Sequence, residues 1–247
     1  MIVTIIRNEL NMLFTSPLAW ILLTLIQLIF TWVFLGRLDA FLEIQSQLLQ
    51  IANPPGVTEA IIAPVFAMAA IVLLMVTPLL SMRLLAEERR NHTLTLLISA
   101  PISMIDIVVG KFLGLMIFFL IINILIVTLC ASLLLGGTLD FGLLGSNTIG
   151  LLLVSACFSA VGLYISSLTA QPAVAAIGTL GALLGLWIID IAASEENQWL
   201  HAISLLKHFE RFNQGLIDTF SIAYFILFVA TFLVLTIRHL DNKRLHG

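Results

Sequence analysis

The chain has 247 residues, of which 60% are hydrophobic and only 10% charged, and its mean hydropathy is +1.13. Soluble domains are about 45–50% apolar and about 25% charged, so a water-soluble core of this size could not bury so many apolar side chains. The formal net charge of −3 and the lack of a basic block argue against a nucleic-acid partner.

Residues 2–15 predict a short amphipathic helix ahead of the first long apolar run. The residues of its mainly apolar side are Ile2, Ile5, Ile6, Glu9, Leu10, Leu13 and Phe14. We expect this helix to lie flat at the inner membrane interface, with that side in the headgroup boundary. Ser16-Pro17 would end it, because proline disfavours helix for the residue before it. The alternative is that the segment simply begins a long first span.

Six continuous apolar runs follow, each long enough to cross a membrane. A helix rises about 1.5 Å per residue, so about 20 apolar residues cross the roughly 30 Å hydrocarbon core. We therefore predict an all-α integral membrane protein, one domain over residues 1–247, with spans at about 17–36, 61–82, 112–135, 142–167, 173–192 and 220–238. The first run is too long for a signal-peptide core and lacks a convincing cleavage site, so we expect a retained anchor.

The second span carries Pro78 near its end, which predicts a kink just before a charged segment. The third and fourth spans meet at a tight connection, Gly136-Gly137-Thr138. The fourth and fifth spans carry small residues that predict close helix packing, namely Ser155, Ser159, Gly162 and Ser166, and then Gly178, Gly181 and Gly185. Gln171-Pro172 predicts the turn between these two spans.

Residues 194–218 are polar but keep apolar side chains at an approximate helical period. We expect short amphipathic helices resting on the outer membrane face. The positive-inside bias sets the orientation, with both termini in the cytosol of a bacterial inner membrane. Eight basic residues then lie inside and three outside; the inner set is Arg7, Arg83, Arg89, Arg90, Lys111, Arg238, Lys243 and Arg244.

The sequence predicts no catalytic centre. No central Asp, Glu, Lys, Arg or His interrupts the six apolar cores, which argues against a proton-driven antiporter. The five histidines lie in predicted loops or tails, and there is no phosphate-binding loop or catalytic motif. Cys130 and Cys157 are expected to be small buried hydrophobes. If the protein does work, a partner must supply the energy.

Residues 83–111 form the one long polar segment between two apolar runs. The expected kink is followed by Glu87-Glu88-Arg89-Arg90, and residues 93–98 can then form a short amphipathic helix that Pro101 ends. A surface helix with an apolar ridge and adjacent charges suits docking in a groove of another protein. The patterning alone equally fits an ordinary solvated connector.

This segment resembles the first cytosolic loop of ATP-binding-cassette (ABC) type-2 permeases, particularly the gliding-motility (GldF-like) and NosY-type groups. The matching residues are Met82 to Arg90, Thr93-Leu94, Leu96-Leu97, Ala100-Pro101 and Gly110-Lys111-Phe112. His208-Phe209, Phe212, Gly215 and Ile217-Asp218, before the last span, also resemble that family. The similarity extends over the length of the chain.

The resemblance implies a six-span permease, paired in the membrane, whose cytosolic coupling helix between spans 2 and 3 sits in a cleft of a separate ATPase subunit. That subunit would bind ATP and Mg²⁺, so no cofactor is expected in this chain. The residues implied in the ATPase contact are Glu87, Glu88, Arg89 and Arg90 as polar contacts, Thr93 beside them, and Leu94 and Leu97 as apolar anchors.

Two functions fit these expectations. The first is the membrane subunit of an ABC exporter. The second is a membrane anchor or assembly factor, of the motility or metalloenzyme-maturation type, which uses the ATPase without transporting a small solute and could contact a periplasmic auxiliary protein. An intramembrane enzyme is disfavoured because the spans lack polar groups. The sequence indicates no substrate.

Overall fold

The computed structural model describes residues 2–48, 56–91, 103–135, 139–192 and 204–246, and all regular structure in these ranges is helical. Six helices are long and apolar enough to cross a membrane, as predicted. They are α2 (Pro17–Leu48), α3 (Val57–Ser81), α6 (Met104–Ala131), α7 (Phe141–Leu168), α8 (Pro172–Ala192) and α11 (Thr219–His246). The chain is therefore a multi-pass, all-α membrane protein. Residues 136–138, the predicted tight connection, lie outside the described ranges.

Helix α7 is the centre of the bundle. It packs against α3, α6, α8 and α11. Of the 18 consecutive residues that make up its apolar stretch, 67% are buried, whereas the corresponding share is 17% in α8 and in α11. The predicted small residues explain this position, because Ser155, Ser159 and Ser166 are fully buried and let neighbouring backbones approach. At Gly162 an added Cβ would lie 2.5 Å from the Ser81 hydroxyl of α3.

The glycines of α8 differ from the prediction. Only Gly178 lies close to a neighbouring helix, where an added Cβ would be 3.0 Å from Ile165. Gly181 and Gly185 have nothing within 4 Å of such a Cβ. Gly181 is exposed and Gly185 is half-buried, so within the described ranges these two glycines do not hold another helix in close contact.

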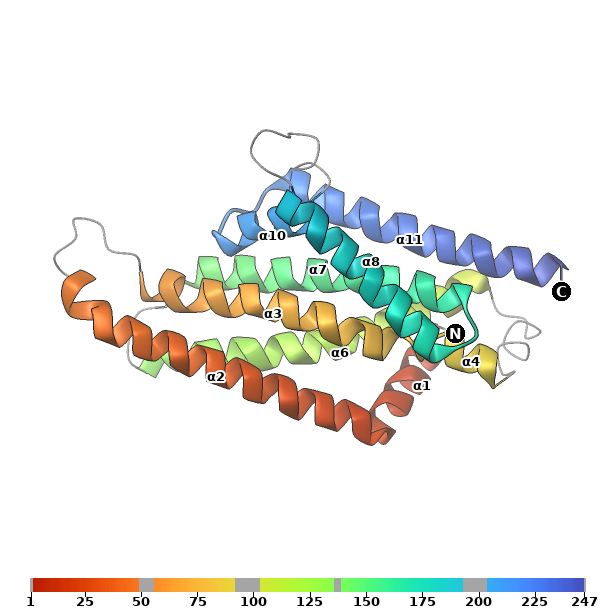
Figure 1. Ribbon diagram of the computed structural model, residues 1–247, viewed down its shortest axis with the longest axis horizontal. Helices are drawn as coiled ribbons and strands as arrows, with labels where there is room; N and C mark the ends of the chain where they lie inside the picture. The colour runs from red at the N-terminus through yellow and green to blue at the C-terminus, as the bar shows by residue number, and fades with distance from the viewer. Residues whose placement is uncertain (1, 49–55, 92–102, 136–138, 193–203, 247) are drawn as a thin grey trace.

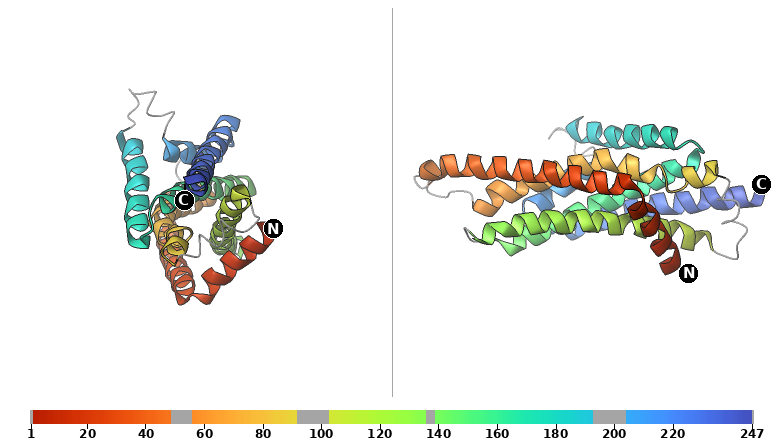
Figure 2. Two further views of the ribbon diagram at one scale, coloured as in Figure 1. Left: turned by 90° about the vertical axis from the view of Figure 1, so that its right-hand side faces the viewer. Right: turned by 90° about the horizontal axis from the view of Figure 1, so that it is seen from below.

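Three shorter helices complete the described fold: α1 (Ile2–Thr15), α4 (Ala86–Arg90) and α10 (Leu205–Asn213). A short 3-10 turn (Ser132–Leu135) extends α6. Both termini lie at the end of the bundle that carries α4, which we call the α4 end (Figure 1). At that end α1 runs across from α2 to α6 (Figure 2).

Helix α2 is longer than the predicted span. It continues through Gly36 and Arg37 to Leu48, and 32 residues at about 1.5 Å each give a length of about 48 Å. A hydrocarbon core is about 30 Å thick, so α2 must tilt or project beyond it. The charged residues after Gly36 mark the end of the apolar stretch but not the end of the helix.

Helix α10 is the amphipathic helix expected in the polar segment before the last span, but its apolar side does not rest on a membrane surface. It packs against α7, α8, α3 and α11, and Leu205, Phe209 and Phe212 are buried. Gly150 of α7 provides the space, because an added Cβ would lie 2.6 Å from Phe212 Cβ. The periodicity predicted the helix correctly, whereas its contacts are with the bundle.

Candidate functional site: a buried charge cluster at the α4 end

Three elements that are distant in the sequence meet at the α4 end: helix α1, helix α4 and the first turns of α6. Helix α3 ends at Ser81, three residues after Pro78, and a turn over residues 82–85 leads into α4. Because proline cannot donate a backbone hydrogen bond to the preceding turn, it weakens the helix there. The expected kink is thus an interruption that separates α4 from the span.

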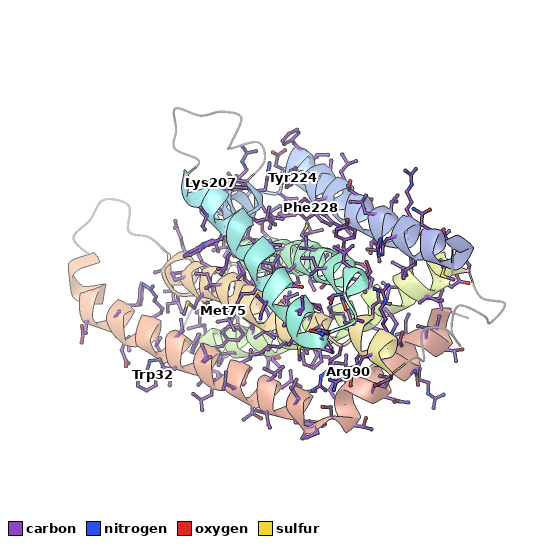
Figure 3. The ribbon with its side chains drawn as sticks, turned by 45° about the vertical axis from the view of Figure 1, so that its right-hand side comes forward. Trp32, Met75, Arg90, Lys207, Tyr224 and Phe228 are labelled. Atoms are coloured by element: carbon purple, nitrogen blue, oxygen red, sulfur yellow. The ribbon has the colours of Figure 1, made fainter. Side chains whose placement is uncertain are left out.

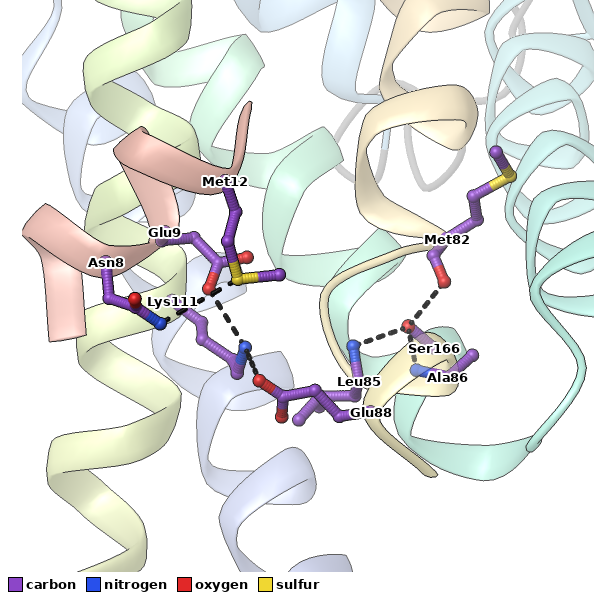
Figure 4. Close-up of polar contacts among 9 residues, drawn as sticks. All are labelled: Asn8, Glu9, Met12, Met82, Leu85, Ala86, Glu88, Lys111 and Ser166. Carbon is purple, nitrogen blue, oxygen red and sulfur yellow. Dashed lines mark hydrogen bonds and ion pairs between the residues drawn. The ribbon is translucent and has the colours of Figure 1, made fainter. Parts of the chain in front are cut away.

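Lys111 lies at the centre of this meeting point (Figure 4). Its Nζ lies 3.0 Å from Glu9 Oε2 on α1 and 2.7 Å from Glu88 Oε1 on α4. The side chains of Lys111, Glu9 and Glu88 are only 2%, 6% and 15% exposed. A buried charge is tolerated only when it is paired and hydrogen-bonded, so the three side chains depend on one another.

Two glycines of α6 let α1 approach closely enough for this pairing. An added Cβ at Gly110 would lie 2.8 Å from Ile5 Cγ2, and one at Gly114 would lie 3.0 Å from Glu9 Cβ. Residues four apart lie on one face of a helix, so the two glycines form a shallow groove for α1. The predicted helix therefore exists as a separate element, and part of its apolar side packs on α6. Its placement at the membrane interface stays a prediction.

Glu9 is the more buried of the two acids in the cluster. Burial raises the pKa of the Glu9 carboxyl above its ordinary value, and the charge and hydrogen bond of Lys111 oppose this rise without cancelling it. The cluster holds two carboxylates and one ammonium group, so Glu9 is the acid that would take up a proton with least disturbance.

Arg83 adds a second contact between the same elements. Its Nη1 donates a hydrogen bond of 3.2 Å to the hydroxyl of Ser16, the residue between α1 and α2. Its Nε lies 4.0 Å from Glu87 Oε2, with both side chains more than a third exposed. The exposed pair adds little stability, whereas the hydrogen bond joins the turn before α4 to the bend after α1.

Ser166 holds the turn before α4 against the central helix. Its hydroxyl accepts hydrogen bonds from the N–H groups of Leu85 at 3.2 Å and Ala86 at 3.1 Å (Figure 4). It also donates to the carbonyl oxygen of Met82 at 3.4 Å. Ser166 is completely buried, and these backbone donors would otherwise be left unpaired. Helix α4 is therefore fixed to α7 as well as to α6.

The remaining two residues of α4 with predicted roles face a pocket. Arg89 is half-buried and Arg90 is exposed, and both border a pocket of about 780 Å³ shared with the turn between α7 and α8. Arg89 Nη2 is enclosed and has no hydrogen-bond partner within the described ranges. Gln171 of that turn also lines the pocket.

The structure thus separates the predicted contact residues into groups. Glu87 and Arg90 remain accessible, Arg89 lines the pocket, and Glu88 points inward to Lys111. Three further predicted residues, Thr93, Leu94 and Leu97, lie outside the described residues, as does the expected short helix over residues 93–98. Contact of any of these residues with an ATPase stays a prediction.

Sequence reasoning missed Lys111, Glu9 and Ser166 as site residues. A signal for the first pair was present, because Glu9 stands among the apolar residues of an otherwise regular amphipathic pattern. A carboxylate in that position requires a cationic partner, and Lys111 stands at the edge of an apolar run beside Gly110. Ser166 carries no comparable signal, because small residues are common where membrane helices pack.

A second cavity lies on the flank of the bundle. It has a volume of about 750 Å³ and is bordered by α1, α2 and α6, with Trp20, Trp32 and Leu125 among its lining residues. Gln27 is one of its few polar residues, and its Oε1 has no partner within the described ranges. Asn123 of α6 donates a hydrogen bond of 3.1 Å to the Thr148 carbonyl and so joins α6 to α7.

No curated protein matches the chain. Residues 3–243 match the sequence model of a family described as "ABC-2 family transporter protein", which is almost the entire chain. The protein therefore belongs to the ABC-2 family of transporter proteins and is a permease component of an ABC transporter.

Proposed function

We propose that the chain is the transmembrane subunit of an ABC exporter and that it couples ATP hydrolysis by a separate ATPase subunit to export across the cytoplasmic membrane. The observation that supports this proposal best is the buried cluster of Glu9, Glu88 and Lys111. It joins the segment expected to contact the ATPase to the amino-terminal helix α1 and to the membrane-spanning helix α6.

The contacts of α4 explain how movement of this segment would reach the bundle. Glu88 binds Lys111 at 2.7 Å, and the start of α4 is held by Ser166 of α7. A force on α4 cannot displace it alone without breaking a buried ion pair or unpairing buried backbone donors, both of which are costly. The force is therefore transmitted to α6 and α7, and through Glu9 to α1.

The orientation in this proposal places the α4 end in the cytosol. Both termini, α1 and α4 lie at that end (Figure 1), and it carries the excess of basic residues that the positive-inside bias requires. ATP and Mg²⁺ would bind to the ATPase subunit. The motif from Met82 to Arg90 supports placing the chain near the GldF-like and NosY-like permeases within its family.

The test separates docking from transmission. Glu87→Lys reverses an accessible charge, whereas Glu88→Gln removes a buried one; each variant is co-expressed with the cognate ATPase and purified. We expect Glu87→Lys to weaken assembly of the complex and Glu88→Gln to assemble but to lose coupled ATPase activity, measured as the difference between the complex and the ATPase subunit alone. Glu43→Lys, an exposed charge reversal on α2 at the opposite end, is the control.

A double variant provides the decisive outcome. Glu87→Lys combined with Glu88→Lys alters both the accessible and the buried acid of α4. Full retention of complex assembly and of coupled ATPase activity in this variant would refute the assignment of α4 to coupling.

A further inference from the structure

The pocket beside Arg89 and Arg90 has the electrostatic character of an anion site. Two guanidinium groups border it, and one nitrogen of Arg89 is enclosed without a hydrogen-bond acceptor within the described ranges. The two acids of α4 have cationic neighbours of their own: Glu87 Oε2 lies 4.0 Å from Arg83 Nε, and Glu88 Oε1 lies 2.7 Å from Lys111 Nζ. Arginine presents several N–H donors in a plane and binds phosphate and carboxylate groups well.

The amino end of α8 borders the same pocket. Helix α8 begins at Pro172, and Ala173 lines the pocket wall. The first N–H groups of a helix have no acceptor within the helix, and the helix dipole adds partial positive charge there. This end of α8 therefore complements the two arginines, which carry the main charge.

An apolar stripe of α3 leads out of this pocket. Met82 lines the pocket, and the residues before it at intervals of three and four are Leu79, Met75 and Ile71. These three side chains are 41%, 58% and 39% exposed. Residues at such intervals lie on one helix face, so the stripe is continuous from the pocket along the surface of α3.

Helix α8 carries a matching stripe. It begins at Ala173 in the pocket, continues through Ile177, which is 73% exposed, and reaches Leu184 and Trp187. The two stripes meet again at a narrow apolar cleft that Met75 shares with Leu184 and Trp187. Figure 3 labels Met75 beside α8 and Arg90 near its α4 end. We call this strip between α3 and α8 the α3–α8 seam.

The length of the seam matches one leaflet of a bilayer. Met82 and Ile71 are separated by eleven residues, which is about 16 Å along the helix axis. The hydrocarbon core of a bilayer is about 30 Å thick, so one leaflet contributes about 15 Å. A phosphate group at the arginines would therefore place an extended acyl chain along the full apolar stripe.

We propose that the α3–α8 seam binds an anionic phospholipid, with its phosphate between Arg89 and Arg90 and one acyl chain along Leu79, Met75 and Ile177. A carboxylate of a partner protein would account for the arginines but not for the apolar stripe that starts in their pocket. The site goes beyond the coupling role proposed for α4, and it assigns Arg89 and Arg90 to a lipid.

The experiment uses the purified chain without its ATPase, so the result does not depend on the coupling proposal. Detergent-solubilised protein is titrated with phosphatidylglycerol, with phosphatidylcholine of the same chains, and with inorganic phosphate, and bound lipid is measured by native mass spectrometry. We expect phosphatidylglycerol to bind about tenfold or more tightly than phosphatidylcholine. Both lipids carry a phosphate, but the quaternary ammonium of phosphatidylcholine offsets the phosphate charge and is repelled by the two arginines, whereas phosphatidylglycerol keeps a net negative charge. Inorganic phosphate should not compete at equal concentration.

Variants test both parts of the seam. Arg89→Gln with Arg90→Gln should reduce phosphatidylglycerol affinity to that of phosphatidylcholine, whereas Arg7→Gln, an exposed arginine of α1, should leave it unchanged. Leu79→Asn should weaken both lipids. Size-exclusion chromatography of each variant verifies folding, and the lipid comparison on the unaltered chain needs no variant at all.

Three results would overturn the proposal. Equal binding of the two lipids by the unaltered chain would mean that charge is not recognised. Competition by inorganic phosphate at equal concentration would indicate an anion site without a lipid. Unchanged phosphatidylglycerol binding by the arginine variant would mean that Arg89 and Arg90 do not hold the phosphate.

Discussion

Replacement of Lys111 by methionine tests whether the buried cluster holds the α4 end together. Methionine keeps the length and apolar stem of lysine but removes the charge, so Glu9 and Glu88 are left facing each other at 6% and 15% exposure. We expect the variant to fold less stably and to lose the association of α1 with α6.

The magnitude follows from the burial of all three groups. At about 3 Å and an effective dielectric constant of about 20, each ion pair has an attraction of about 5–6 kcal/mol, most of which desolvation offsets. Removing one partner leaves the other charges uncompensated, which destabilises by about 3–5 kcal/mol. Lys207→Met is the matched control, because Lys207 and Glu210 are 3.4 Å apart but 36% and 55% exposed. An exposed pair of this kind contributes about 0–1 kcal/mol.

The pH dependence gives the experiment a second readout. Burial raises the pKa of Glu9, and Lys111 is the group that lowers it, so the variant has an even higher pKa at this carboxyl. A raised pKa in the folded state favours folding at low pH, and this contribution is lost as the pH rises through the raised value. The deficit of Lys111→Met should therefore be largest at pH 8 and shrink toward pH 5.

The assay is thermal or denaturant unfolding of the purified variants in one detergent at pH 5, 7 and 8. Adding Glu9→Gln and Glu88→Gln to Lys111→Met should recover much of the loss, since no buried charge then remains in the cluster. If Lys111→Met is as stable as Lys207→Met at every pH, the reasoning about the buried cluster is wrong.

Three further predictions concern packing, the turn before α4 and orientation. Gly150→Ala should destabilise the fold by about 1–3 kcal/mol in unfolding assays because α10 must shift, whereas Gly145→Ala, with open space around its Cβ, should be neutral or slightly stabilising. Ser166→Ala should cost about 1–3 kcal/mol by unpairing buried backbone donors and should lower coupled ATPase activity; an unchanged unfolding midpoint would contradict this. An impermeant thiol reagent should label Asn91→Cys only in inside-out vesicles and Arg37→Cys only in right-side-out vesicles, and the reverse pattern would invert the proposed orientation.

The spans could be predicted because a long apolar run has few alternatives to a transmembrane helix. The ends of the spans were less certain, and α2 continues as a helix past Gly36 to Leu48. Composition indicates where a helix leaves an apolar environment. The helix itself continues as long as its backbone hydrogen bonds continue, which composition does not show.

Contacts between elements were the part that periodicity could not supply. The patterns of α1 and α10 predicted helices with one apolar side, and a membrane surface is the default neighbour of such a side. In both cases glycines of a membrane-spanning helix allow close packing: Gly110 and Gly114 of α6 for α1, and Gly150 of α7 for α10. The sequence around a glycine within a span does not indicate which helix packs against it. A single sequence therefore could not predict that α1 packs on Gly110 and Gly114 or that α10 packs on Gly150.

The cluster at Lys111 also constrains how the chain can be assembled during synthesis. Glu9 emerges from the ribosome 102 residues before the lysine that neutralises it, and Glu88 emerges 23 residues before it. Until α6 is inserted, the amino-terminal helix therefore has no cationic partner and no glycine groove in which to settle. The contact between the first helix and α6 can therefore form only after the third span has been made, so it is one of the later contacts of the amino-terminal half.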